Sequence, residues 1–251
     1  MIEKTEQYNT APETGTWQTS ALLLGAVMFP EGPWCFGSKY CDSLASFFPE
    51  NWDSDFLYED TTGYHPNNQL DIFNQGKVFV TYAAHGSPLG FYWYYPYPVC
   101  PPIMDVTSIS SMSNGKKLPW VHGSRTCSTG SLTINGFAEM IVELEGGGAI
   151  LAIASSNGAF GSPTGPGPGG WLGIYFTHML FDEDLVTAGV THGVSKDMFW
   201  ANWNSFYIPR MAEWSVQALN LYGDPCTVFT GAPEGVESGA PQLLDIHISP
   251  N

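Results

Sequence analysis

Basic residues are scarce in this 251-residue sequence: it holds 8 Lys and Arg against 24 Asp and Glu, a formal net charge of −16. Nucleic acids and anionic membranes bind proteins through clustered Lys and Arg, so this balance argues against both as partners. Only 13% of the residues are charged, so the imbalance reflects missing bases and not the acid-rich surface of a halophile. The many Gly, Pro, Ser, Thr, Asn and aromatic residues indicate a secreted or cell-surface protein.

Long hydrophobic runs are also missing. No segment reaches the roughly 18 apolar residues that a membrane span requires. The start, Met1–Glu6, has neither the basic nor the apolar region of a secretory leader, so either the protein is cytoplasmic or the numbering begins after a removed leader. The length fits one globular domain with a full core.

Cysteine is infrequent, and the count is odd. Five cysteines allow two disulfides and one free thiol, or five unpaired thiols. If one thiol is free, we expect it to be Cys127. No His/Cys cluster has the spacing of a zinc site, so we predict no metal centre.

The acids between the first two apolar segments are a weaker metal candidate. They could hold a structural calcium ion, but they lack the Asp-x-Asx-x-Asx-Gly pattern, and a solvated acidic face explains them more simply. These acids are Asp53, Asp55, Glu59 and Asp60.

Short apolar segments alternate with segments of helical spacing. Residues 78–82 are apolar on both faces, which is typical of a strand covered on both sides in a parallel sheet. Residues 21–27 and 149–154 have the same character, and Phe137–Leu144 has helical spacing between them. This strand, helix, strand order predicts an α/β fold with helices flanking a parallel sheet.

The remaining segments complete the predicted domain, 17–231. We expect residues 1–16 to form a loose arm, and the tail 232–251 to be loose except for a possible edge strand at 243–248. The other predicted elements are helices at 41–48, 70–76, 171–181, 196–203 and 209–221, and a final strand at 227–230.

Two of the predicted strands end at residues that carry chemistry. One strand stops at His85-Gly86-Ser87, and another stops at Cys127-Ser128. Ligands of open parallel sheets sit at the carboxyl ends of the strands, and 42 residues allow one crossover between neighbours. His85 and Cys127 could therefore lie side by side. Glu31 also follows a strand end.

A cysteine nucleophile acts as the thiolate, and a neighbouring imidazole can take or hold the proton. Backbone N–H groups of Ser128 or Gly86 could stabilise the oxyanion of a tetrahedral intermediate. The alternative is a buried cysteine and a core histidine. His122 is close to Cys127 in sequence, but we interpret it as structural because it lies within the strand.

Two further segments are candidate substrate-binding elements. The aromatic run 91–98, which includes Trp93, either walls a cleft, binds a partner or simply packs. The Gly- and Pro-rich segment 155–170 follows a strand and is either a substrate loop or an irregular surface loop.

Taken together, several motifs resemble the gingipain-like family of clan CD cysteine peptidases, in the order and at the intervals of that family. The resemblance covers about residues 17–230. The motifs are Val80-Thr-Tyr-Ala-Ala-His85-Gly-Ser87, Leu118-Pro119, Thr126-Cys127-Ser-Thr-Gly130, Phe137-Ala-Glu139, Ala152-Ile-Ala-Ser155, Gly189-Val-Thr191 and Gly223-Asp-Pro225.

The resemblance implies a caspase-like three-layer α/β/α sandwich with a mostly parallel central sheet. It implies a cysteine endopeptidase with His85 as general acid/base and Cys127 as nucleophile. It assigns Glu31 to orienting the histidine and Phe160 to the wall of the primary specificity pocket. No cofactor is required, and the partner is a peptide or protein substrate.

The sequence also departs from the family. Ala84 stands where the family usually has Gly, and Thr126 stands where it has a small residue. The acid of arginine-specific members has no clear match, because Gly37 or Ser38 aligns there. A catalytically inactive structural or binding module therefore remains the alternative, and a transpeptidase is a third option.

Overall fold

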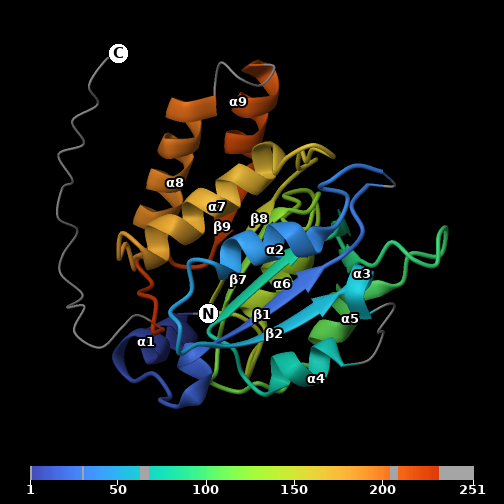
Figure 1. The fold of residues 1–251 in the computed structure, drawn as a ribbon. Coiled ribbons are helices and arrows are strands. Elements are labelled where there is room, and N and C mark those ends of the chain that lie inside the picture. Colours follow the sequence, from blue (N-terminus) through green and yellow to red (C-terminus); the bar gives the residue numbers. More distant parts are fainter. Residues whose placement is uncertain (1, 30, 63–67, 204–208, 232–251) are drawn as a thin grey trace.

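A six-stranded sheet forms the centre of the computed structural model, which describes residues 2–29, 31–62, 68–203 and 209–231. The order is β2-β1-β3-β7-β8-β9, and only the last pairing is antiparallel (Figure 1). The strands are β1 Ser20–Gly25, β2 Asp53–Tyr58, β3 Phe79–Ala83, β7 Trp120–Arg125, β8 Leu151–Ser155 and β9 Leu219–Tyr222.

Helices cover both faces of this sheet. Helices α2 (Gly37–Ala45) and α7 (Gly167–Phe181) pack on one face, and α8 (Ala188–Trp203) and α9 (Pro209–Ala218) lie against α7 (Figure 1). Helix α6 (Phe137–Glu143) covers the other face. The predicted three-layer α/β/α fold with a mostly parallel central sheet is confirmed. None of the helices in the described part of the chain is long and apolar enough to cross a bilayer.

An insertion between β3 and β7 forms a second, three-stranded antiparallel sheet. Its strands are β4 (His85–Ser87), β5 (Gly90–Tyr92) and β6 (Pro102–Asp105), in that order. The short helices α3 (Glu59–Thr62), α4 (Gln69–Asn74) and α5 (Val106–Ile109), with a 3-10 helix at Thr16–Thr19, complete the described elements.

Alternating side chains divide the core into two layers. In β1, Ala21 and Leu23 face the α2/α7 side, whereas Leu22 and Leu24 face the α6 side. Strand β8 alternates in the same way. Since side chains alternate across a strand, a continuous apolar run fills both layers, which is why β1, β3 and β8 were recognisable from sequence.

The expectation of a loose arm over residues 1–16 is wrong. Residues Ile2–Thr10 form helix α1, and Tyr8 is buried against the core. Lys4 Nζ donates to the carbonyls of Val142, Leu144 and Gly147 at the end of α6. A cation at a helix C-terminus is stabilising. Helix α1, although mostly polar in sequence, is therefore held to the domain by one tyrosine and one lysine.

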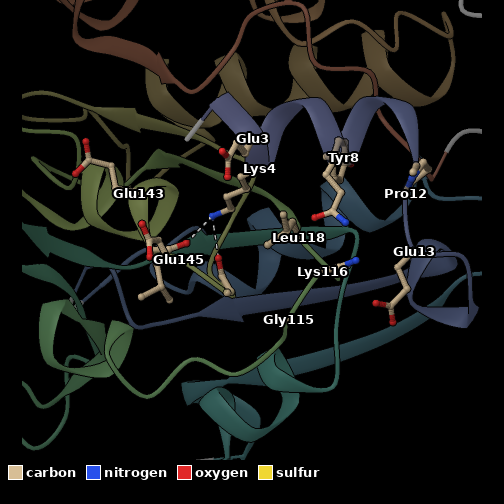
Figure 2. Close-up of a pocket in the computed structure, with 15 residues that line it drawn as sticks. Glu3, Lys4, Tyr8, Pro12, Glu13, Gly115, Lys116, Leu118, Glu143 and Glu145 are labelled. Atoms are coloured by element: carbon tan, nitrogen blue, oxygen red, sulfur yellow. Dashed lines mark hydrogen bonds between the residues drawn. The ribbon is translucent and has the colours of Figure 1, made fainter.

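A hollow of about 420 Å³ lies beside α1, and Figure 2 shows Lys4 reaching across it. Its lining includes Leu118, which precedes β7, and Gly147, which precedes β8. The hollow is therefore at the amino ends of the strands, away from His85 and Cys127.

Three other boundaries differ from the expectation. The polar-looking segment Asp53–Tyr58 is edge strand β2, and helix α9 ends at Ala218, where β9 begins. The final strand expected at 227–230 is only an isolated bridge between Val228 and Thr187. The edge strand expected at 243–248 lies outside the described residues.

Two buried histidines make the fold sensitive to acid. His122 is 1% exposed and stacks on Phe176, with ring centroids 4.7 Å apart. Burial lowers the pKa of His122, and that of His192, to about 3. His122 therefore belongs to the core, as the sequence indicated.

We expect His122→Phe to flatten the loss of stability in acid. The unfolded chain takes up protons below pH about 6.5 while the native histidines stay neutral, so each histidine costs about 1.4 kcal/mol per pH unit between about 6.5 and 3. Phenylalanine keeps the ring contact and removes this proton. Urea unfolding at pH 7, 6, 5 and 4 measures the slopes, and parallel curves for the variant and wild type would contradict the prediction.

Candidate active site

His85 and Cys127 follow two adjacent strands of the central sheet. Strands β3 and β7 pair in parallel, and Ala83 is the partner of Arg125. His85 and Cys127 each come two residues after this pair. A Cβ added to Gly86 would overlap the carbonyl oxygen of Cys127. The structure therefore brings the histidine and cysteine segments into direct contact, as the strand ends predicted.

The two departures from the family pattern meet at this junction. Thr126 Oγ1 accepts a hydrogen bond from Ala84 N at 3.2 Å. The Thr126 methyl also lies against Gly86, where an added Cβ would be 2.5 Å from it. Ala84 and Thr126 are both 1% exposed. The unusual threonine thus ties the histidine loop to the cysteine strand.

The His85 ring is held by a backbone carbonyl. Nε2–H donates to Val27 O at 3.1 Å, because a carbonyl can only accept. Nδ1 is then the nitrogen that remains for proton exchange. Burial lowers the pKa of His85, and the Val27 bond and the nearby Glu59 carboxylate oppose that shift. The Tyr94 ring lies beside the imidazole, with centroids 5.5 Å apart.

Glu59 is the acid that supports this site, and sequence reasoning assigned it to a solvated face. It is 6% exposed and follows β2 directly. Its carboxylate accepts from Val27 N at 2.7 Å, Tyr94 N at 3.0 Å and Tyr95 N at 2.5 Å. It therefore fixes both the residue that binds His85 and the tyrosine beside it.

Glu31 makes no hydrogen bond or ion pair with His85 within the part of the chain that the structure describes. It lies in an exposed turn after β1. Its assignment as the orienting acid stays a prediction without a hydrogen bond behind it, whereas Glu59 binds the Val27 N–H whose residue holds the imidazole.

The Cys127 sulfur faces the loop that follows β8. Sγ accepts a hydrogen bond from Ala159 N at 3.3 Å. Ser128, at φ 59°, uses its N–H to bind Asn157 O at 2.9 Å. The proposed use of the Ser128 N–H for an oxyanion is therefore wrong, because that donor is already engaged. Gly86 remains the candidate donor.

The two aromatic candidates differ in position. Trp93 is 1% exposed and packs in the core of the α6 side, so it cannot contact a substrate. Phe160 is half-buried and follows Ala159, the residue that contacts the Cys127 sulfur. Phe160 thus remains a candidate for a pocket wall.

The structure also locates the other cysteines and the acids. All five cysteines are free, so the alternative with two disulfides is not the one observed. No group of three His, Cys, Asp or Glu side chains within the described residues could hold a metal ion. Asp55 pairs with Lys77 at 2.5 Å, and Asp60 accepts from Ser38, so two of the acids considered as calcium ligands have separate partners.

Fold and site together define an α/β/α protein with a histidine and a cysteine at adjacent strand ends, the arrangement of caspase-like peptidases. The model of peptidase family C25 matches residues 1–230. The chain belongs to this family, the gingipain family of clan CD.

Solved structures agree on the fold. The crystal structure of the Arg-specific cysteine proteinase gingipain R has a TM-score of 0.72 and 17% identity, covering 91% of this chain and 51% of that chain. A complex of Porphyromonas gingivalis RgpB pro- and mature domains has a TM-score of 0.66 and 16% identity, covering 91% and 52%. This chain thus spans about half the length of these structures. No curated protein matches it.

Proposed function

We propose that this protein is a cysteine endopeptidase that uses Cys127 and His85. The observation that carries the proposal is the contact between the Gly86 backbone and the Cys127 carbonyl, with the His85 ring fixed through Nε2. The bond to Val27 leaves Nδ1 of His85 for proton exchange, on a segment that touches the cysteine segment. Family membership supports the same conclusion.

The chemistry proceeds through an acyl-enzyme. The Cys127 thiolate forms a bond to the scissile carbonyl carbon, and the C=O π electrons move to oxygen, where the Gly86 N–H donates to the oxyanion. The oxyanion collapses, the C–N bond breaks, and His85 gives a proton from Nδ1 to the leaving amine. Water then adds to the thioester carbonyl carbon and gives a proton to His85. The tetrahedral intermediate collapses, the C–S bond breaks, and the carboxylic acid leaves while the Cys127 thiolate and protonated His85 are restored.

This scheme needs no cofactor and takes a peptide or protein as substrate. An amine in place of water would make the same thioester a transpeptidase intermediate. The abundance of Gly, Pro, Ser, Thr, Asn and aromatic residues supports action outside the cell or at its surface.

A binding module is the second candidate, and one observation favours it. Four apolar side chains in the insertion after His85 are at least 49% exposed. Exposed apolar side chains that lie together on a surface often mark a binding site. The four side chains are Leu89, Tyr95, Tyr97 and Val99. Such a surface fits partner binding with or without catalysis.

Thiol labelling tests the catalytic proposal. We expect a small alkylating probe to label Cys127 rapidly between pH 5 and 8 and at least 10-fold more slowly in His85→Ala, because the imidazole holds the thiol proton. A peptide library should be cleaved by wild type and left intact by Cys127→Ala. Cys226, the exposed thiol, is the internal reference for an unassisted cysteine. Labelling at the rate of Cys226, together with an intact library, would leave only the binding module.

A further inference from the structure

The buried Arg125 precedes the candidate nucleophile by two residues. It is the last residue of β7, two positions before Cys127, and it is 1% exposed. Its guanidinium lies 5.9 Å from the Trp34 ring and 5.7 Å from the Tyr40 ring. One terminal nitrogen donates to Trp34 O at 3.2 Å.

Apart from these two ring contacts, the rest of this guanidinium has no partner. Nε and Nη1 are buried without a hydrogen bond, and no carboxylate of the described residues forms an ion pair with it. A buried unpaired charge costs several kcal/mol, so buried arginines are normally paired. Burial lowers the pKa of Arg125, yet arginine stays protonated in proteins. The site therefore has a cation and two free donors but no anion.

Arg125 and Cys127 face the same loop. A Cβ at Gly161 would lie 3.6 Å from Arg125 Nε, and Ala159 N contacts Cys127 Sγ. Arg125 ends β7 and Cys127 follows it by two residues, so their Cα atoms are at most about 7 Å apart. A residue whose carbonyl sits at Cys127 can thus direct a short side chain toward the guanidinium.

We propose that Arg125 selects an acidic residue, Asp or Glu, on the amino side of the cleaved bond. A carboxylate would accept hydrogen bonds from the free guanidinium donors and neutralise the buried positive charge. The inference rests on the proposed peptidase function and adds its substrate class. It reverses the charge expected for a pocket that binds arginine.

Trp34 and the loop 156–166 cover the arginine. Trp34 N donates to Pro163 O at 2.9 Å, and a Cβ at Gly32 would lie 2.6 Å from that carbonyl oxygen. The half-buried Phe29 lies against Gly161. The acidic side chain reaches Arg125 only when this loop moves outward.

Fluorogenic peptides that differ only at the residue before the cleaved bond test the inference. We expect kcat/KM for Asp or Glu to exceed that for Asn or Gln by about 100-fold or more, because a neutral amide leaves the buried cation unpaired. Arg125→Lys should keep part of the preference, and Arg125→Met should lose it. The control is Arg210→Met, which removes the chain's other arginine at an exposed position of α9. Preferred cleavage after basic or apolar residues overturns the inference and leaves the peptidase intact.

A binding measurement separates this inference from the catalytic proposal. Cys127→Ala protein should bind an amide-capped Asp peptide at least 10-fold more tightly than its Asn counterpart, and Arg125→Met should abolish the difference. Equal affinities, or binding of neither peptide, overturn the acidic preference. Tight Asp binding without turnover or Cys127 labelling in wild type would support the role of Arg125 and reject the peptidase.

Discussion

Gly86→Ala should reduce the rate of Cys127 alkylation by about 100-fold while the protein stays folded. The alanine Cβ would overlap the Cys127 carbonyl oxygen and lie 2.5 Å from the Thr126 methyl group. Relief requires the histidine loop to move away from the end of β7. A displacement of about 1 Å at a reacting group costs about 100-fold in rate, and peptide turnover should fall with the labelling.

Gly158→Ala is the matched control for this substitution. Gly158 lies in the loop beside Ala159, and nothing is within 4 Å of an added Cβ. Its labelling rate should equal that of wild type. The melting temperature and circular dichroism of both variants show whether Gly86→Ala acts on the site or on the whole fold. An unchanged labelling rate in Gly86→Ala would mean that the close approach has no role in positioning His85.

Glu59→Gln should destabilise the protein by about 3 kcal/mol and lower the pKa of His85 further. The buried carboxylate accepts three backbone N–H groups, and an amide replaces one accepting oxygen with a donor that faces another donor. A nearby negative charge favours the imidazolium, so its removal favours the neutral ring. Urea unfolding measures the first effect, and NMR titration of the His85 ring measures the second.

Asp60→Asn is the control for Glu59→Gln. Asp60 is the next acid in sequence, but among the described residues it accepts only the Ser38 hydroxyl, which an asparagine oxygen can also accept. We expect little change in stability and in the His85 titration. If Glu59→Gln leaves the His85 pKa where it was, Glu59 serves only to hold the backbone. If Glu31→Gln moves it instead, the original assignment of Glu31 was right.

Sequence patterns revealed the centre of the fold because both faces of its strands are covered. Continuous apolar runs identified β1, β3 and β8, and the ends of β3 and β7 identified His85 and Cys127. Edge strand β2 was missed because its first four residues are exposed or half-buried, so Asp53, Ser54 and Asp55 resembled a loop. Helix α1 was not predicted because its sequence is mostly polar, and it docks on the domain mainly through Tyr8 and Lys4.

The supporting acid could not be found in this way. Glu59 stands in an acidic stretch, and only the packing of the insertion 85–105 buries it beneath Tyr94 and Tyr95. Glu31 follows a strand end as a supporting acid should, but its turn is exposed. Glu59 immediately follows strand β2, so its place at a strand end could have indicated a supporting role. That indication was lost because β2 itself was not predicted.

The hydrogen bonds of Glu59 also bear on how the protein folds. They join residues 32, 35 and 36 positions apart, and the His85 bond to Val27 spans 58 positions. Contacts of this separation form late, because closing the long loop between the two residues costs conformational entropy. A nascent chain with only its local elements formed therefore has no assembled thiol–imidazole pair, and competence to react appears with the last long-range contacts.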